Sequence, residues 1–196
     1  MATDYRPRHG DARLVAPRSL CSSSPSRTDW HYETPSPAMP NYQLEIRRAE
    51  TADVPTLVAL MQSFYAEASF ALPTGSATRA FQALLADPRL GSVWLAEDES
   101  GAIGHLVLTL CFSMEYGGLR GFIDDLYVRP AARGRGAGAR LLGAAREDAV
   151  QRGVRALHVE VGPDNDVARR LYARAGYVDS GHLFLSLPLA SPVHAT

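Results

Sequence analysis

A glycine-rich stretch between a strand-like and a helical pattern constrains this chain most. It reads Arg133-Gly134-Arg135-Gly136-Ala137-Gly138, and it joins a strand-like run at 121–128 to a helical pattern that begins near Ala139. Small residues at such a junction let a phosphate approach bare main-chain N–H groups, and the helix adds the positive end of its dipole. Arg133 and Arg135 add side chains that suit phosphate oxygens. The stretch therefore indicates a diphosphate site, with a simple tight turn as the alternative.

Two common nucleotide-binding motifs do not match this stretch. Its spacing differs from the G-x-G-x-x-G of dinucleotide-binding folds. The phosphate loop of nucleoside triphosphatases requires Gly-Lys-Ser/Thr, whereas this chain contains no lysine and its 20 basic residues are all arginine. Both the dinucleotide-binding motif and the phosphate loop are therefore excluded.

Length, charge and cysteine content narrow the class of protein. A chain of 196 residues fits one domain with a hydrophobic core and a tail. The formal net charge is −1 with both signs interspersed, so we expect no nucleic-acid partner. Its apolar runs are shorter than the roughly 18 residues of a bilayer span, so we expect no membrane insertion. Cys21 and Cys111 form neither a disulfide framework nor a metal site, so we expect no metal and a cytoplasmic location.

The first 40 residues differ in composition from the rest. Residues 1–40 are rich in proline and serine and show no amphipathic period. Such a segment cannot bury enough apolar area to offset its chain entropy. We therefore predict a disordered N-terminal extension over 1–40 and a folded domain over 41–190. Met39 lies just before the first regular pattern and is an alternative start of the translated chain.

The folded part alternates strand-like and helical patterns, which predicts an α+β fold with a mixed sheet. The expected strands are 43–48, 92–97, 103–112, 122–128, 156–161, 177–178 and 182–187. The expected helices follow the apolar stripe from Val54 to Tyr65, then 78–85, a stretch from about Ala139 to Val150, and 166–175. Strand periodicity would place Phe122, Asp124, Leu126 and Val128 on one face, and Ile123, Asp125 and Tyr127 on the other.

Two motifs within this pattern carry a family resemblance. The first is Ile123-Asp124-Asp125-Leu126-Tyr127-Val128-Arg129-Pro130 followed by Arg133-x-x-Gly136-x-Gly138. The second is Asn165-x-x-Ala168-x-x-x-Tyr172-x-x-x-Gly176-Tyr177. Together with the element order, they resemble the GNAT superfamily of acetyl-coenzyme A-dependent N-acetyltransferases over roughly Leu44 to Leu187.

The resemblance implies a fold and a co-substrate. It implies a mixed, mostly antiparallel sheet of six or seven strands flanked by four helices. A V-shaped splay would separate strands 4 and 5, and a bulge in strand 4 would create it and shift the register of that strand. Acetyl-CoA would be the co-substrate and a small-molecule amine the acceptor; dimers are common among members, which leaves a homodimer open. The main chain of Leu126, Tyr127 and Val128 would bind the pantetheine arm. Asn165 would bind that arm or simply cap its helix. The diphosphate would lie against Arg133, Gly134, Arg135, Gly136, Ala137, Gly138 and Ala139.

The resemblance also implies catalytic roles. Tyr172 would be the general acid that protonates the departing thiolate, with a packed core tyrosine as the alternative. Asp124 stands where many members carry a glutamate and would be the general base, with Asp125 as its structural partner. Aspartate is one methylene shorter than glutamate, so water is an alternative base. The main-chain N–H of Val128 would stabilise the oxyanion.

The acceptor side is less defined by motifs. We expect it to involve Phe64, Tyr65 and Glu67 on the first helix, and Glu115 and Tyr116 in the loop before the strand at 122–128. Convergence of Glu67, Glu115 and Asp124 would suit a cationic amine; otherwise these are solvated charges. Two alternatives to a small-molecule acetyltransferase stay open: a protein N-terminal acetyltransferase and a non-catalytic acyl-CoA sensor.

Overall fold

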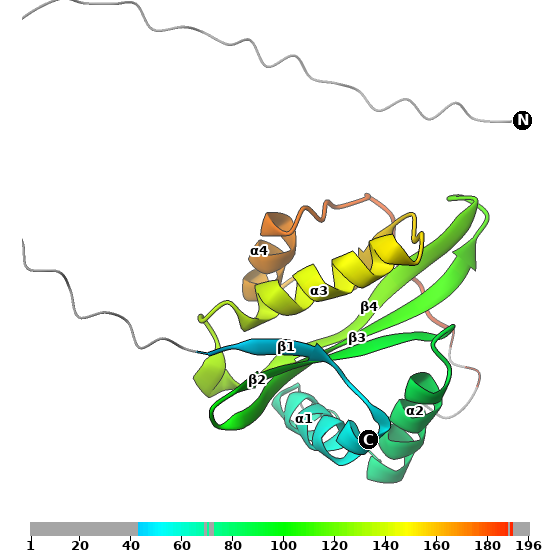
Figure 1. The fold of residues 1–196 in the computed structure, drawn as a ribbon. Helices are drawn as coiled ribbons and strands as arrows, with labels where there is room; N and C mark the ends of the chain where they lie inside the picture. Colours follow the sequence, from blue (N-terminus) through cyan, green and yellow to red (C-terminus); the bar gives the residue numbers. More distant parts are fainter. Residues whose placement is uncertain (1–42, 69, 71–72, 188, 190–196) are drawn as a thin grey trace, which may run out of the picture. The chain divides into compact units, whose positions relative to one another are not determined.

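The computed structural model describes residues 43–68, 70, 73–187 and 189, so the predicted extension 1–40 lies outside the described residues. Five strands form one sheet in the order β1-β2-β3-β4-β5 (Figure 1). Neighbouring strands are antiparallel from β1 to β4, whereas β4 and β5 are parallel. The strands are β1 (Glu45–Arg48), β2 (Gly91–Asp98), β3 (Gly101–Ser113), β4 (Gly118–Val128) and β5 (Leu157–Val159).

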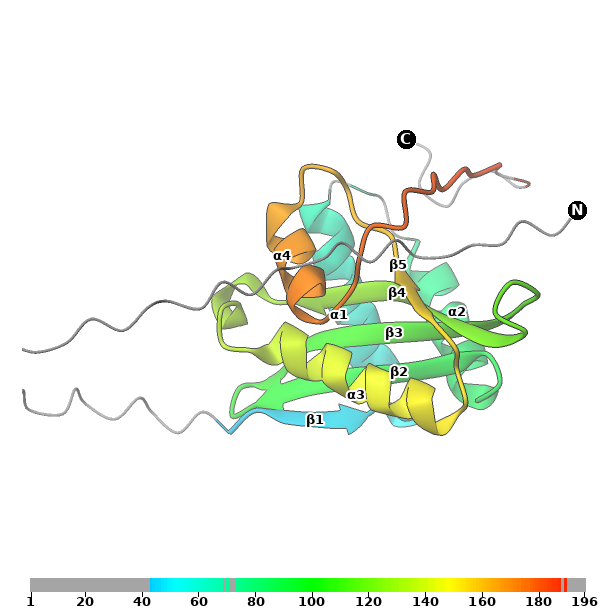
Figure 2. The same ribbon diagram turned by 90° about the horizontal axis from the view of Figure 1, so that it is seen from above.

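Four α-helices cover the two faces of this sheet. They are α1 (Val54–Glu67), α2 (Thr74–Ala86), α3 (Ala137–Gln151) and α4 (Asp166–Arg174). Figures 1 and 2 show α3 and α4 on one face, with α1 and α2 on the opposite face. The α+β class and the four helices are confirmed, although α2 begins earlier than the predicted residue 78 and α3 two residues before Ala139. None of the helices in the described part of the chain is long and apolar enough to cross a bilayer.

The hydrophobic core consists of two clusters separated by the sheet. The α3-side cluster includes Leu106, Leu108, Ile123, Leu141 and Tyr172. The α1-side cluster includes Leu57, Leu60, Phe81, Leu95 and Tyr127. Each amphipathic helix buries its apolar stripe against one face, and alternate residues of β2, β3 and β4 supply the other half of each cluster. The predicted core stripe of α1 is thereby confirmed at Leu57 and Leu60.

The predicted count of six or seven strands is wrong for the described residues, which contain five. The segments 177–178 and 182–187 form no strand. Their apolar side chains are largely exposed, with Leu183 at 88% and Leu185 at 86%, although the Phe184 ring lies 6.1 Å from that of Phe122. A strand needs a ladder partner as well as suitable composition, and β5 offers an edge of only three residues.

Candidate active site

β4 and β5 pair over a short distance and then separate. Their parallel ladder contains three residue pairs and ends at Ile123 and Val159, whereas β4 continues to Val128. A strand directs alternate main-chain groups to each of its edges, so the stretch beyond Ile123 presents donors and acceptors on the side that β5 has left. The ladder therefore ends at the place where the family resemblance predicts a splay between strands 4 and 5. The side chains of Leu126, Tyr127 and Val128 pack in the core, and one edge of their main chain pairs with β3, so only the groups on the other edge face the side that β5 has left.

A β-bulge at Asp124 lies at the point where the strands separate. Asp125 pairs with Val107 of β3 and Ile123 with Leu108, so Asp124 is the extra residue on β4. The bulge reverses the strand's alternation: Ile123 joins the α3-side cluster, while Tyr127 joins the α1-side cluster. The predicted faces of β4 are therefore wrong on this point, because an inserted residue shifts every later side chain to the other face.

The two acidic residues differ in environment because of the bulge. Asp124 is exposed, and its pKa is raised because neighbouring atoms displace part of its water. Asp125 is 7% exposed and lies opposite Val107, on the face covered by α1. A solvent-accessible carboxylate with a raised pKa is suited to accept a proton, and a buried one to a supporting role.

The glycine-rich loop leads directly into α3. Gly134 and Gly136 have positive φ values of 77° and 87°, and a Cβ on either would meet no atom within 4 Å. Gly136 is the N-cap of α3 and supplies no side-chain cap, so the first N–H groups of the helix stay available, including those of Ala137 and Ala139. Gly138 has another role, because its Cβ would lie 3.2 Å from Leu171 of α4. The loop thus fits a diphosphate: bare, exposed main chain at the positive end of a helix dipole.

Arg133, the first residue of this loop, reaches back to α1. Its Nη2 donates to Oε2 of Glu67 at 2.7 Å, and its Nε donates to the carbonyl oxygen of Val128 at 2.8 Å. The guanidinium also lies 5.7 Å from the centre of the Tyr127 ring. Arg133 lowers the pKa of the Glu67 carboxyl by hydrogen bonding and by its charge. Arg133, which is predicted to bind the diphosphate, is thus bonded to Glu67, which is predicted to contact the acceptor. Arg135, the other arginine of the loop, is exposed.

Asn165 and Tyr172 both belong to α4. Asn165 caps the helix, since its Oδ1 accepts from the N–H of Ala168 at 3.1 Å, which confirms the capping alternative. Tyr172 is buried in the α3-side cluster, and its ring lies 5.5 Å from that of Tyr177. Burial is the main reason why the pKa of Tyr172 rises to about 12, with smaller contributions from Tyr177 and Asp125. At neutral pH the phenol is protonated and can serve as a proton donor.

Tyr65 lies near Asp124 and Asp125, on the opposite face of the sheet from Tyr172. Burial, followed by the charges of Asp125 and Asp124, raises the pKa of Tyr65 to about 12. The neighbouring Phe64 ring lies 5.5 Å from that of Tyr127 on β4. The charge of Asp125 therefore acts on both Tyr65 and Tyr172, whereas that of Asp124 acts on Tyr65.

Glu115 and Tyr116 do not join Glu67, contrary to the convergence considered from the sequence. They lie in the turn between β3 and β4, and the Tyr116 ring is 5.6 Å from that of His158 on β5. Glu115 raises the pKa of His158, although burial and Arg120 lower it overall.

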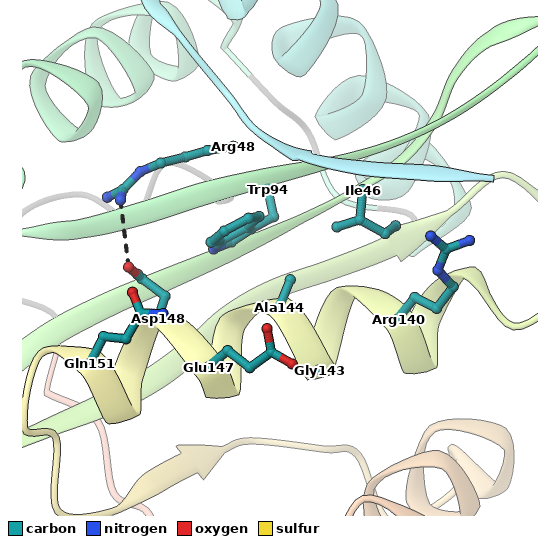
Figure 3. A pocket seen from close by; sticks show the side chains of 9 residues that line it. All are labelled: Ile46, Arg48, Trp94, Arg140, Gly143, Ala144, Glu147, Asp148 and Gln151. Carbon is teal, nitrogen blue, oxygen red and sulfur yellow. Dashed lines mark hydrogen bonds and ion pairs between the residues drawn. The ribbon is translucent and has the colours of Figure 1, made fainter.

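A separate hollow of about 560 Å³ lies between β1 and α3 (Figure 3). Its lining includes Trp94 and the ion pair between Arg48 and Asp148, which are 3.5 Å apart. Asp148 is buried and accepts from Ser92 Oγ at 2.7 Å and from Arg152 Nε at 3.0 Å. This network ties α3 to the sheet. No predicted site residue lines the hollow, and the described residues contain no group of three or more metal-ligating side chains.

A comparison with known protein families shows to which family this chain belongs. The model of the Acetyltransferase (GNAT) family matches residues 57–177, which include the bulged strand, the glycine loop and α4. The chain belongs to the GNAT family. This GNAT protein is an N-acetyltransferase that uses acetyl-CoA as its co-substrate.

Individual relatives agree with this assignment. An uncharacterized N-acetyltransferase from Bacillus subtilis (strain 168), YhfO, is 32% identical over 151 residues, which are 74% of this chain and 99% of YhfO. An integron cassette protein from a salt-marsh metagenome has a solved structure with a TM-score of 0.71 and 50% identity, covering 76% of this chain and 93% of its own. A predicted acetyltransferase from Clostridium acetobutylicum, solved with acetyl-CoA, shares the fold at a TM-score of 0.65 and 21% identity, covering 75% and 97%.

Proposed function

We propose that this GNAT enzyme transfers the acetyl group of acetyl-CoA to a primary amine of a small molecule by direct attack. Asp124, or a water molecule that it binds, acts as the base, and Tyr172 acts as the general acid. The observation that carries the proposal is the acidic bulge on β4 at the point where its ladder with β5 ends. The charge of Asp125 influences both Tyr65 and Tyr172, so the acidic bulge of β4 lies near the tyrosines of α1 and α4.

The proposed binding site for acetyl-CoA consists mainly of main-chain groups. Acetyl-CoA supplies its acetyl group as a reactive thioester. In the proposal its arm lies along β4 from Leu126 to Val128, where β5 has separated, and bonds to main-chain amides as an added strand would. Its diphosphate lies against the loop from Arg133 to Gly138 and the first turn of α3. Asn165, which already caps α4, bonds the arm from the other side.

The proton balance assigns one role to each catalytic group. The neutral amine nitrogen attacks the thioester carbonyl carbon, an N–C bond forms, and the carbon–sulfur bond breaks. Asp124 takes the proton that the nitrogen loses, directly or through water, because the side chain is exposed and has a raised pKa. The main-chain N–H of Val128 stabilises the developing oxyanion. Tyr172 donates its phenolic proton to the departing sulfur, and its elevated pKa keeps that proton in place until the transfer.

The acceptor side favours a cationic or aromatic amine. Phe64 and Tyr65 provide ring faces beside the acidic pair, and ring faces attract cations. Glu115 and Tyr116 lie near His158 and would contact the far part of a longer acceptor.

An amine panel tests the proposal directly. The protein is incubated with acetyl-CoA and alkylamines, arylamines, amino sugars or short peptides, while free thiol and acetylated products are measured. We expect stoichiometric thiol and N-acetyl product with at least one small amine. Turnover restricted to peptide N-termini would make this a protein acetyltransferase, and tight acetyl-CoA binding without any transfer would make it a sensor.

A further inference from the structure

One ion pair connects the predicted co-substrate loop with the acceptor side. Arg133 Nη2 donates to Glu67 Oε2 at 2.7 Å, and its Nε donates to the carbonyl oxygen of Val128. Glu67 is the last residue of α1, one turn after Phe64, whose ring lies 5.5 Å from that of Tyr127. The same Tyr127 ring lies beneath the Arg133 guanidinium. A single side chain is therefore bonded both to the end of β4 and to the carboxylate at the end of α1.

We propose that Arg133 exchanges Glu67 for the diphosphate of CoA, and that the released Glu67 carboxylate then binds the positive charge of the acceptor amine. Co-substrate binding thereby completes the acceptor site. This inference rests on the proposed function, since it names the acceptor-recognition residue of that same site and how the site is formed.

The strengths of the two partners favour the exchange. Arg133 and Glu67 are 43% and 45% exposed, and exposed ion pairs contribute little to stability. A diphosphate offers the guanidinium more charge and more acceptor oxygens, and arginine binds phosphate through two parallel N–H donors. The exchange therefore loses a weak interaction and gains a stronger one.

The released carboxylate is suited to a cationic ligand. Arg133 lowers the pKa of Glu67, and without Arg133 the carboxyl returns toward its ordinary value of 4.5, so it remains ionised at neutral pH. The neighbouring Phe64 and Tyr65 rings stand edge to face at 5.5 Å. An alkylammonium between such rings and a carboxylate gains both ion pairing and cation–π attraction.

Calorimetric titration with CoA and with pantetheine, which lacks the diphosphate, tests the exchange. Glu67→Gln removes the competing charge, so we expect CoA to bind about twofold to fivefold more tightly and pantetheine with unchanged affinity. In an Arg133→Gln background, Glu67→Gln is expected to change neither affinity. Glu99→Gln, in the turn between β2 and β3, is the matched control and should bind both ligands as the wild type does.

Two results would overturn the exchange. One is weaker CoA binding by Glu67→Gln, as expected if the ion pair only holds α1 against the loop. The other is an equal change for CoA and pantetheine, because a general structural effect does not depend on the diphosphate. The titration with CoA and pantetheine needs no acceptor amine, so it gives an answer even where the proposed function fails.

A second arm concerns the acceptor. With acetyl-CoA at saturation, Glu67→Gln should raise KM about fivefold for an alkylamine that the wild type acetylates, which carries a charge at neutral pH. The KM of an arylamine, which is neutral at that pH, should stay unchanged. An equal rise for both amines would contradict a charge-recognition role for Glu67.

Discussion

The co-substrate side and the acceptor side of this site are built from different materials. On the co-substrate side, the main chain is exposed: Gly134 and Gly136 adopt positive φ values, and β4 continues past its ladder with β5. On the acceptor side, Tyr65 and Tyr172 are partly or fully buried aromatic side chains with pKa values of about 12. In the proposal, the first side binds acetyl-CoA mainly through main-chain groups that every residue possesses. The second side must select the amine and move protons, which only particular side chains can do.

The largest expected effect is on the co-substrate side. Gly136→Glu places a carboxylate where the diphosphate is expected, and two charges about 4 Å apart repel by about 4 kcal/mol at an intermediate dielectric. CoA affinity should therefore fall by about 100-fold or more. Gly153→Glu is a matched control, since Gly153 also has a positive φ, of 70°, and open space around its Cβ, but lies beyond the end of α3. Equal CoA affinity in calorimetry for both variants would mean that the loop is only a turn.

The next effect separates the two acids on β4. Asp124→Asn should lower kcat/KM by about 100-fold by removing the base, with an unchanged melting temperature because the residue is exposed. Since the pKa of Asp124 is raised above 3.8, the wild-type kcat/KM should fall as the pH drops through that raised value. Asp125→Asn, at a buried position, should instead lower the melting temperature. Loss of activity in Asp125→Asn alone, at an unchanged melting temperature, would transfer the role of base to Asp125.

A smaller effect is expected on the leaving group. Tyr172→Phe keeps the packed ring and removes the proton donor, so kcat should fall about tenfold while CoA affinity stays nearly constant, with water supplying the proton in its place. Tyr177→Phe removes a hydroxyl from the ring 5.5 Å away and should leave kcat unchanged. Identical kcat values for the wild type and Tyr172→Phe would restrict Tyr172 to a packing role.

The smallest expected effect comes from His105 in the α1-side core, and it concerns stability. His105 is fully buried between Phe81 and Tyr127, and burial lowers its pKa to about 4. The unfolded chain therefore binds more protons between pH 6.5 and 4, so stability is complete above pH 6.5 and falls toward pH 4, by on the order of 3 kcal/mol. Denaturant unfolding should show this loss in the wild type and a flatter profile in His105→Leu. Parallel profiles would mean that His105 does not titrate on unfolding.

The sequence predicted the local structure of the glycine loop and of α4 well because its signals are local. The spacing of Gly134, Gly136 and Gly138 reflects main-chain conformation and helix packing, and both can be recognised from residue types alone. The helix-cap role that was considered for Asn165 beside binding of the arm is confirmed. The confirmed helices follow from the same local rules.

The predictions that failed depend on contacts between residues that lie far apart in the sequence. Strict alternation along β4 failed because the bulge at Asp124 depends on the partner strand β3. The predicted strands at 177–178 and 182–187 failed because apolar composition does not supply a ladder partner. Glu67 was predicted as an acceptor residue without its partner Arg133, which is 66 residues away in the chain. No periodicity in the sequence contains that contact.

A crystal structure of the complex with CoA tests the central claim most directly. The account predicts the pantetheine amides within hydrogen-bond distance of the main chain between Leu126 and Val128, and the diphosphate against the N–H groups from Gly134 to Ala139. A β4–β5 ladder that continues past Ile123 and Val159, with CoA bound elsewhere, would contradict it.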